Sequence, residues 1–282
     1  MNISIIGGDS RIIELVKLLE KDHAIELCGL EKAEDLKKLN HTDNLEKTLQ
    51  KADLVITSIP LSKDGKYVNS AYSDKKILIE HIFKNAKNKK IITGNITKEI
   101  QELINNTEKS NEVIDILKLE ELTVLNAIPT AEGAIQIAME ESKITIHNSK
   151  CLILGFGRIG KILAKMLRGI GANVYCEARK QQDISWINAY GYNQILLTDL
   201  DKYLNEFDFI FNTIPYIILD KDKLSKIKKE CVLIDLASKP GGIDFEEAKK
   251  LNLKTNWALA LPGKVAPKTA AFYISEIIKN IE

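Results

Sequence analysis

The sequence predicts an α/β fold made of two similar domains, each built on a parallel sheet. Short runs rich in Val, Ile and Leu alternate with longer segments of helical period, which is the pattern of β-α units. The chain has 282 residues, about twice the usual domain length of roughly 100 to 150 residues. The two halves also repeat: ISIIGGDSR opens the first as CLILGFGRIG opens the second, and ADLVITSIP parallels FDFIFNTIP.

The first half supplies predicted strands at 3–6, 24–28, 54–57 and 90–93. A helix is predicted at 11–20, because its apolar residues fall on one face: Ile12, Leu15, Val16 and Leu19. The polar stretch 95–122 has no clear period, so no element is assigned there.

The second half supplies six predicted strands, the number in a complete dinucleotide-binding sheet of the Rossmann type; they are 151–154, 173–176, 194–197, 209–212, 232–236 and 255–259. A helix at 130–141, with Thr130 as its N-cap, is predicted to connect the two domains. The apolar helix 269–281 has no strand after it, so we expect it to fold back onto the first domain. The predicted domains are 1–125, joined by 268–282, and 126–267.

The composition excludes several classes of protein. Lys and Arg number 40 against 39 Asp and Glu, and aromatic residues make up 6%, so nucleic acid is not an expected partner. No apolar run approaches the roughly 20 residues of a membrane span, and the N-terminus lacks the pattern of a signal peptide. The four cysteines stand apart in apolar runs, as core residues do. We therefore expect a protein of the reduced cytoplasm, without a membrane partner.

The strongest local signal is a glycine motif that follows the strand CLIL and opens a helix of 3.6-residue period; it consists of Gly155, Phe156, Gly157, Arg158, Ile159 and Gly160. Gly155 permits the tight turn, Gly157 lets a pyrophosphate approach the backbone, and Gly160 lets the helix pack on the strand. The motif predicts a nicotinamide dinucleotide site, so residues 126–267 are assigned as the NAD(P)-binding domain. The alternative is a purely structural turn.

The end of the next strand indicates which cofactor is preferred. NAD enzymes carry an acidic residue there, about 20 positions after the motif, that binds the ribose 2′-hydroxyl, and Ala178 stands at that place. Arg179 and Lys180 follow and are placed to bind a 2′-phosphate, which favours NADP over NAD. Two alternatives stay open: both cations are solvated loop residues, or the adjacent Glu177 faces the ribose and NAD is preferred.

Five short proline-containing segments each follow an apolar run that resembles a strand: 58–60, 127–129, 213–215, 238–242 and 261–267. Ligands of open α/β sheets bind beyond the carboxyl ends of strands, so we expect these segments to line a cleft between the domains. Prolines also simply end strands, which is the alternative. Near two of the segments the cofactor site is predicted to continue through Asn212, Thr213, Ile214, Pro215, Leu236 and Ala237.

Taken in order, IIGGDSR, NAIPTAEGAI, LGFGRIGK, NTIP, LIDLASKPGGIDF and LPGKVAPKTAA resemble the A subunits of dipicolinate synthases of endospore-forming bacteria. The resemblance runs along nearly the whole chain. It departs at Lys239, where an arginine is expected, and in the middle of the first domain.

The resemblance implies an oxidoreductase of sporulation, in the mother-cell cytoplasm, that works with a flavoprotein-like B subunit. Together they would oxidise a dihydrodipicolinate-type intermediate, from a branch of the lysine pathway, to dipicolinate. Any FMN is expected on the B subunit and none on this chain, and we expect an oligomer. The first domain would then serve the substrate and the partner.

A planar dicarboxylate needs cations and hydrogen-bond donors, and the proline-containing segments offer both. For catalysis we select Lys264, which we expect in a loop, with Lys239 and Glu132, the acid as a general base. For substrate binding we select Lys264 again, with Ser58, Thr130, Ser238, Lys268, Thr269 and Arg11. The alternatives are ordinary ones: lysines are mostly solvated, hydroxyls cap helices, and acids near helix starts interact with the dipole.

The histidines lie outside all of these segments; they are His23, His41, His81 and His147. The histidine–carboxylate pair of 2-hydroxyacid dehydrogenases is therefore not seen, and no metal site is predicted. Two other functions stay open: a stand-alone NAD(P)-dependent 2-hydroxyacid or amino-acid dehydrogenase, and a non-catalytic NADP-binding scaffold protein.

Overall fold

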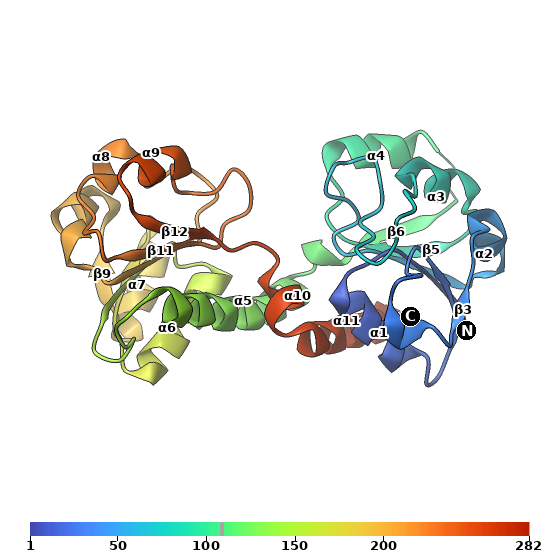
Figure 1. The fold of residues 1–282 in the computed structure, drawn as a ribbon, viewed down its shortest axis with the longest axis horizontal. Helices are drawn as coiled ribbons and strands as arrows, with labels where there is room; N and C mark the ends of the chain where they lie inside the picture. The colour runs from blue at the N-terminus through green and yellow to red at the C-terminus, as the bar shows by residue number, and fades with distance from the viewer. Residues whose placement is uncertain (108–109, 282) are drawn as a thin grey trace. The chain divides into compact units, whose positions relative to one another are not determined.

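The computed structural model describes residues 1–107 and 110–281, and the chain divides into two units. Unit 1 is Met1–Leu125 with Ala266–Glu282, and unit 2 is Asn126–Val265. Within the described residues each unit contains one six-stranded parallel sheet with helices around it (Figure 1). The predicted α/β fold with two Rossmann-like sheets is confirmed.

In unit 1 the strand order is β3-β2-β1-β4-β5-β6. The strands are β1 (Asn2–Ile6), β2 (Ala24–Cys28), β3 (Asn40–His41), β4 (Leu54–Thr57), β5 (Lys90–Thr93) and β6 (Glu112–Asp115). The helices are α1 (Ser10–Leu19), α2 (Leu45–Lys51), α3 (Ile79–Asn85), α4 (Lys98–Asn105) and α11 (Pro267–Ile281), with short 3-10 turns η1 (Glu34–Leu36) and η2 (Ile116–Lys118). The unassigned stretch 95–122 thus contains α4 and β6.

The core of unit 1 depends on the C-terminal helix. The buried face of α1, with Ile12 and Leu15, packs against α11 through Ile274 and Ile278, and all four side chains are at most 1% exposed. Figure 1 shows α1 and α11 side by side. Burial of large aliphatic side chains contributes roughly 1.5 to 3 kcal/mol each, so α11 is part of the core that stabilises unit 1.

In unit 2 the strand order is β12-β11-β10-β7-β8-β9. The strands are β7 (Lys150–Leu154), β8 (Asn173–Glu177), β9 (Asn193–Ile195), β10 (Phe209–Asn212), β11 (Val232–Asp235) and β12 (Lys254–Trp257). The helices and 3-10 turns are α6 (Arg158–Ile170), α7 (Gln181–Ala189), η3 (Leu197–Lys202), η4 (Leu204–Glu206), α8 (Lys221–Leu224), α9 (Phe245–Lys250) and α10 (Leu261–Val265). Central strands are buried on both faces, which explains their continuous apolar runs.

The helix that links the two units is longer than predicted. It is α5 (Glu120–Glu141), which contains Pro129 in its interior. Thr130 is therefore not an N-cap; its hydroxyl donates to the Asn126 carbonyl at 2.7 Å, one turn back. Proline removes one N–H from the helix ladder, but a helix that is otherwise well supported can continue through it. Segment 127–129 consequently does not follow a strand, and that prediction is wrong.

Lys264 lies in α10 rather than in a loop, which corrects a second prediction. Pro262 is the second residue of α10 and Pro267 the first of α11. Proline fits the first turn of a helix because the N–H it lacks has no intrahelical partner there. The proline-rich segment 261–267 is therefore a pair of helix starts.

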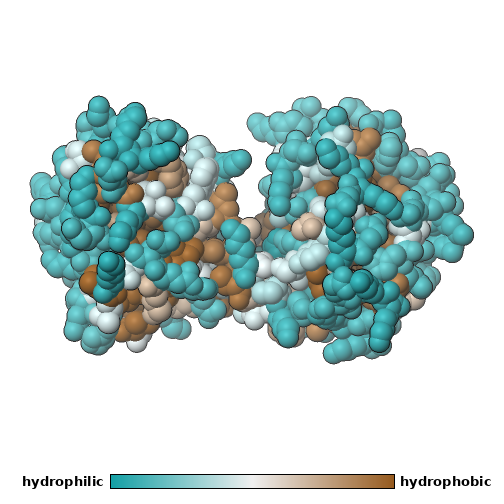
Figure 2. Space-filling model, in the orientation of Figure 1, coloured by the Kyte–Doolittle hydropathy of each residue, from teal (hydrophilic) through white to brown (hydrophobic). Residues whose placement is uncertain are grey.

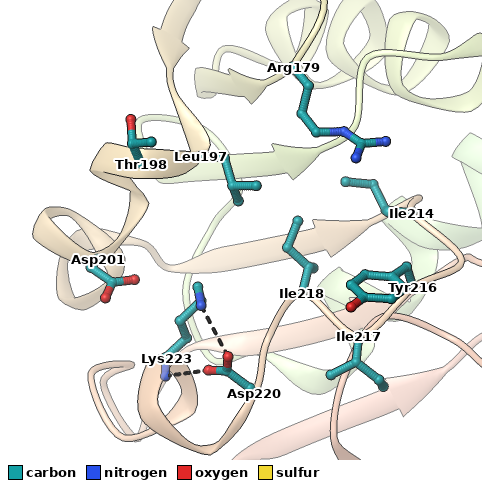
Figure 3. A pocket seen from close by; sticks show the side chains of 10 residues that line it. All are labelled: Arg179, Leu197, Thr198, Asp201, Ile214, Tyr216, Ile217, Ile218, Asp220 and Lys223. Carbon is teal, nitrogen blue, oxygen red and sulfur yellow. Dashed lines mark hydrogen bonds and ion pairs between the residues drawn. The ribbon is translucent and has the colours of Figure 1, made fainter.

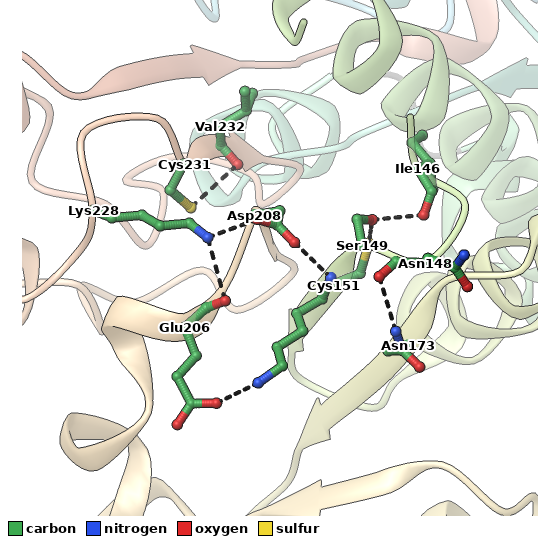
Figure 4. Close-up of polar contacts among 11 residues, drawn as sticks. Ile146, Asn148, Ser149, Cys151, Asn173, Glu206, Asp208, Lys228, Cys231 and Val232 are labelled. Carbon is green, nitrogen blue, oxygen red and sulfur yellow. Dashed lines mark hydrogen bonds and ion pairs between the residues drawn. The ribbon is translucent and has the colours of Figure 1, made fainter. Parts of the chain in front are cut away.

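The edge of unit 2 where the strands begin is closed by polar contacts (Figure 4). The Lys150 ammonium binds Glu206 at 2.6 Å, and its backbone N–H donates to the Asp208 carboxylate at 2.8 Å. Lys228 binds the other oxygen of Asp208, also at 2.6 Å. The charges and hydrogen bonds of these groups are therefore satisfied within the protein, and they connect the starts of β7, β10 and β11. Ligands of such sheets bind at the opposite edge, beyond the carboxyl ends of the strands.

The four cysteines are free and buried, as predicted. Burial raises the pKa of the Cys28 thiol to about 11 and that of Cys151 to about 12. A thiol with such a pKa is not a nucleophile at neutral pH. The cysteines are core residues.

No helix in the described part of the chain is long and apolar enough to cross a membrane. On the face in Figure 2 both units carry mostly hydrophilic side chains, with hydrophobic ones gathered over the α5 and α6 region of unit 2. Met139 of α5 is one of the exposed large hydrophobic residues of the chain.

Candidate functional site

The glycine motif forms a tight turn between β7 and α6. Gly155 has a φ of +90°, and a Cβ there would come within 2.6 Å of the Thr213 hydroxyl. A Cβ on Gly160 would overlap the carbonyl oxygen of Gly155. These two glycines are required by the protein's own packing, because any side chain would strain the turn or separate the helix from the strand.

Gly157 is different, because a Cβ placed on it would meet no atom of the described chain within 4 Å. Gly157 is also the N-cap of α6, and it has no side chain with which to cap the helix. The amide groups of a helix N-terminus attract anions. The open side of this turn therefore fits the pyrophosphate of a dinucleotide.

A cavity of about 130 Å³ lies at this turn, bounded by residues of the glycine motif and of the loop after β8; its lining is Gly155, Phe156, Glu177, Ala178, Arg179, Lys180, Asp183 and Ile214. Ala178 is buried, whereas Arg179 and Lys180 are exposed. The structure thus brings together the predicted pyrophosphate turn and the predicted 2′-phosphate cations.

Glu177, beside Ala178, is fully buried. Neither of its carboxylate oxygens has a hydrogen-bond partner among the described residues. Burial raises the pKa of this carboxyl group above its ordinary value, while the nearby Gly155 N–H and the charge of Arg179 act in the opposite direction. Burial dominates, because taking a carboxylate out of water is costly.

A larger cavity of about 690 Å³ lies beyond the carboxyl ends of β8, β9 and β10 (Figure 3). Arg179 and Ile214 lie near one another at one side, and the apolar side chains of Leu197 and Ile218 lie nearby. Lys223 binds Asp220 at 3.2 Å at the far side. The volume is in the range of small-ligand sites. Sequence reasoning missed Leu197, which begins η3, and Ile218, since isolated apolar residues outside a motif give no signal of a site.

The loops after β10 and β11 are tied to each other by a buried pair. The Asn212 amide donates to the Asp235 carboxylate at 2.8 Å and to the Ile214 carbonyl at 2.9 Å. Asp235 also accepts from the Ala237 N–H at 3.0 Å and the Gly242 N–H at 2.7 Å. Both side chains are fully buried. They hold the backbone of the predicted cofactor segments in place, and Asp235 is committed to these bonds rather than free to act as a base.

The remaining candidates of unit 2 lie at its surface. Ser238 and Lys239 are exposed after β11, Lys264 is exposed in α10, and Glu132 is exposed on α5. Thr130 is half-buried on α5. Exposed ammonium groups are available to a ligand but equally to water.

In unit 1 the candidate site residues differ in their burial and in their hydrogen-bond partners. Arg11 is buried, and its guanidinium binds both oxygens of Asp9 and the Ile59 carbonyl. Ser58, at the end of β4, is fully buried with no partner for its hydroxyl among the described residues. Lys268 and Thr269 are exposed in the first turn of α11. Arg11 therefore holds the Ile59 turn against α1, while Ser58 carries an unused donor.

No group of three or more His, Cys, Asp and Glu side chains that could hold a metal ion is found in residues 1–107 and 110–281. In unit 2, His147 contacts the Ile170 carbonyl at 3.1 Å, at the C-terminal end of α6. It lies away from the glycine turn, which is at the other end of that helix.

Two family models match the chain. Residues 2–117 match the N-terminal domain of the dipicolinate synthase A subunit, and residues 129–242 match the NAD-binding domain of D-isomer specific 2-hydroxyacid dehydrogenases. The dipicolinate synthase A subunit of Bacillus subtilis (strain 168) is 28% identical over 285 residues, which cover 100% of this chain and 95% of that protein. This chain is a homologue of the dipicolinate synthase A subunit.

Solved structures agree with this assignment. The crystal structure of the dipicolinate synthase A subunit from Bacillus halodurans has a TM-score of 0.91 at 28% identity, covering 99% of this chain and 97% of that one. Its Bacillus subtilis counterpart has a TM-score of 0.88 at 27% identity, covering 100% and 95%. A transhydrogenase from Sinorhizobium meliloti, at 13% identity and a TM-score of 0.69 over 99% and 93%, shares the fold alone.

The resemblance to the dipicolinate synthase A subunit is therefore confirmed. With its NAD-binding domain of the dehydrogenase type, the chain is an oxidoreductase with a nicotinamide dinucleotide cofactor. The glycine turn of unit 2 is the part of this domain whose shape fits that cofactor.

Proposed function

We propose that this chain is the A subunit of a dipicolinate synthase, which oxidises a dihydrodipicolinate-type intermediate to dipicolinate together with a B subunit. The observation that carries the proposal is the match to the dipicolinate synthase A subunit over both units. A family match confined to the NAD-binding domain would suit many dehydrogenases, but residues 2–117 match the N-terminal domain of this one family.

The bound nicotinamide would supply a hydride acceptor. Aromatisation of a dihydropyridine ring is favourable, so the protein mainly has to orient the substrate and remove one ring proton. Exposed cations would bind the two carboxylates, and the candidates are Lys239, Lys264 and Lys268. Neutral donors would come from Ser58, Thr130, Ser238 and Thr269, of which Ser58 has an unused hydroxyl.

Glu132 is our candidate for the general base. Asp235 is held by three N–H donors, and Asp244 accepts from the Glu247 N–H at 3.1 Å as the N-cap of α9. Glu132 is exposed on α5 and remains available for proton transfer.

NADP is the proposed cofactor in preference to NAD. Ala178 stands where NAD enzymes carry an acid, and Arg179 and Lys180 are exposed beside the same cavity. Charge-assisted hydrogen bonds contribute about 1.5 to 3 kcal/mol each, or roughly tenfold or more in affinity. Replacing both cations with alanine should weaken NADPH binding by at least about tenfold and NADH binding far less. Equal losses for the two nucleotides would mean that the 2′-phosphate is bound elsewhere.

The proposal includes a flavoprotein-like B subunit, which would carry any FMN, and a role in the mother-cell cytoplasm during sporulation. These parts follow from the resemblance to the dipicolinate synthase A subunit. Unit 1 would serve the substrate and the partner, and unit 2 would bind NADP.

The first test is a titration of the purified chain with NADPH and NADH, followed by nicotinamide fluorescence and repeated with dipicolinate. Tight NADPH binding that dipicolinate alters supports a common site for both ligands. Failure to bind either nucleotide would favour a scaffold role.

Turnover separates the enzymatic alternatives. Oxidation of the dihydrodipicolinate-type substrate only in the presence of the B subunit supports the synthase. Turnover of 2-hydroxyacids or amino acids by the chain alone would support a stand-alone dehydrogenase instead.

A further inference from the structure

The loop after β11 combines an exposed tip with buried ends. Ser238, Lys239 and Pro240, which we call the 238–240 tip, are exposed, whereas the residues on either side of them are buried. The Gly241 N–H donates to the Ser238 carbonyl at 2.8 Å and closes a turn around the tip. Exposed loop tips are commonly mobile, because few contacts restrain them. The groups that hold the two ends of this loop therefore decide how well its tip is ordered.

A single buried carboxylate binds both ends of the tip. Asp235 is fully buried, and one of its oxygens accepts from the Ala237 N–H at 3.0 Å. The other oxygen accepts from the Gly242 N–H at 2.7 Å. The first oxygen also accepts from the Asn212 amide at 2.8 Å. A buried carboxylate is costly unless it is hydrogen-bonded, and here its hydrogen bonds hold the backbone immediately before and after the tip.

The base of the tip is also closely packed. A Cβ on Gly241 would come within 2.8 Å of an Asp235 carboxylate oxygen, so the backbone lies directly against the carboxylate. The indole N–H of Trp257 donates to the Ala237 carbonyl at 3.0 Å. The ring of Trp257 stacks on Phe245, with the ring centroids 5.2 Å apart. The 238–240 tip is thus an exposed turn on a rigid, buried base.

The same loop is bonded to the segment that lines the larger cavity of unit 2. The Gly242 carbonyl accepts from the N–H groups of Ile218 and Leu219, at 2.9 and 3.0 Å, and Ile218 lines that cavity. The tip therefore has a fixed place at the carboxyl edge of the sheet, where ligands of such sheets bind. Of its three residues, Lys239 carries the charge.

We propose that Asp235 is a positioning residue: it holds the 238–240 tip so that the Lys239 ammonium binds one carboxylate of the substrate. A loop whose ends are already fixed loses less conformational entropy when it binds a ligand, and its charged group is oriented in advance. The inference rests on the proposed function and explains how one of its candidate cations is oriented. The alternative is that Asp235 only stabilises unit 2 and that Lys239 is a solvated surface residue.

The test is a double-mutant cycle, read as the dissociation constant of dipicolinate for the full chain saturated with NADPH. Lys239→Gln should raise this constant by roughly tenfold or more, because it removes a charge-assisted hydrogen bond. Asp235→Asn replaces one acceptor oxygen by an NH2 group, which releases one end of the tip, and should raise the constant by about tenfold. The double variant should bind dipicolinate no more weakly than Lys239→Gln alone, because Asp235 acts through Lys239.

A matched control is Asp208→Asn at the opposite edge of the same sheet. Asp208 is also a carboxylate that ties strands together, through the Lys150 N–H at 2.8 Å and Lys228 at 2.6 Å. Its variant should leave the dissociation constant of dipicolinate unchanged, even where unfolding by denaturant shows a loss of stability. A loss of dipicolinate affinity as large as that of Asp235→Asn would overturn the inference, since any weakening of unit 2 would then have the same effect.

Trp257→Phe is a second way to loosen the tip, and it keeps the test valid if Asp235→Asn does not fold. It removes the hydrogen bond to the Ala237 carbonyl and retains a ring to stack on Phe245. Dipicolinate binding should weaken by a smaller factor than in Asp235→Asn. This loss should also disappear when Lys239 is already replaced.

Three results would contradict the inference. Losses that add in the double variants would show that Asp235 and Trp257 act on stability and not through Lys239. Unchanged dipicolinate affinity in Lys239→Gln would overturn the inference alone and leave the proposed function to the other cations. A wild type that binds NADPH but not dipicolinate would overturn the proposed substrate and this inference together.

Discussion

Units 1 and 2 have the same strand order but use the glycine turn after their first strand differently. Numbered along the chain within each unit, both sheets have the order 3-2-1-4-5-6. In unit 2 the turn at Gly157 opens onto free space. In unit 1 the turn at Gly7 and Gly8 is covered by segment 68–71: the Gly8 N–H donates to the Asn69 carbonyl at 2.9 Å, and the Ala71 N–H donates to the Gly8 carbonyl at 3.0 Å. A Cβ on Gly7 would come within 2.6 Å of Val68 and Ser70.

The helices that follow the two turns also differ at their N-termini. In α1, Asp9 is the N-cap, accepts from the Arg11 N–H at 3.0 Å, and forms an ion pair with the Arg11 guanidinium at 2.6 Å. In α6 the N-cap is Gly157, which has no side chain. The positive end of α1 is therefore neutralised by the protein's own carboxylate, whereas that of α6 is left to a ligand anion.

The comparison teaches that a glycine turn in a Rossmann-like sheet is a site only when nothing of the chain covers it. In unit 1, residues 68–71 and the carboxylate of Asp9 lie at the turn that corresponds to the open turn of unit 2. Two sheets with the same strand order thus differ in their glycine turns: the turn is covered in unit 1 and open in unit 2. The covered turn is consistent with the substrate or partner role proposed for unit 1, and the open turn with the cofactor role proposed for unit 2.

The largest expected effect comes from filling the open turn. Gly157→Leu should reduce nucleotide affinity by at least about 100-fold, because the side chain would occupy the space proposed for the pyrophosphate, and its Cβ meets no atom of the described chain within 4 Å. Gly169→Leu is the matched control, since Gly169 of α6 also has open space around it. Fluorescence titration should show loss of binding in the first variant only, with both proteins folded. Unchanged affinity in Gly157→Leu would remove the distinction between the two turns.

A second prediction concerns Gly160, which packs α6 against the turn after β7 and is not expected to contact the cofactor. Gly160→Ala should destabilise unit 2 by about 3 kcal/mol, because its Cβ overlaps the Gly155 carbonyl oxygen. Gly169→Ala should instead stabilise α6 by about 0.5 to 1 kcal/mol. Denaturant unfolding of both variants gives the two free energies. A fully stable Gly160→Ala would show that the helix can move away from the strand.

A smaller effect is expected from the cap in unit 1. Asp9→Ala removes the N-cap of α1 and the partner of the Arg11 guanidinium, and should lower stability by about 1 to 2 kcal/mol. Nucleotide affinity should not change, because the proposed cofactor site is in unit 2. Chemical denaturation and a NADPH titration of the same variant measure both quantities. A loss of NADPH affinity would contradict the separation of roles.

The smallest effect is a pH-dependent gain in stability from Glu177→Gln. Burial raises the pKa of Glu177 in the folded protein, so the unfolded chain loses its proton first, near about pH 4.3, and stability falls as the pH rises toward the folded value. The variant removes this loss and should be about 1 kcal/mol more stable at neutral pH, with little difference near about pH 4. Thermal unfolding across this range checks the sign. A variant that is less stable at neutral pH would mean that the carboxylate has a stabilising partner.

The sequence predicted most strands because buried strands of parallel sheets are short apolar runs that end at turn residues. It missed β3, which has two residues, and β6, which lies in a polar stretch with partly exposed side chains. It also placed the start of α5 at Thr130, because Pro129 reads locally as a helix boundary. In each case the element is supported by tertiary packing that has no local signal.

Candidate side chains were predictable by chemical type but not by their partners. Arg11 was a reasonable carboxylate ligand from its place after the glycine turn, yet the structure pairs it with Asp9 and Ile59. Ser58 stands at the end of β4 as expected, and its unpartnered hydroxyl is visible only in three dimensions.

By itself the sequence determined two α/β halves, a glycine motif between a strand and a helix, and two cations after the next strand. These features depend on periodicity and on the conformational freedom of glycine, which are local properties. Only the tertiary structure decided which glycine turn is open, and that Glu177 is buried without a partner. Both outcomes depend on segments distant in the chain, namely 68–71 over Gly8 and the neighbouring strands around Glu177, and no local pattern encodes such contacts.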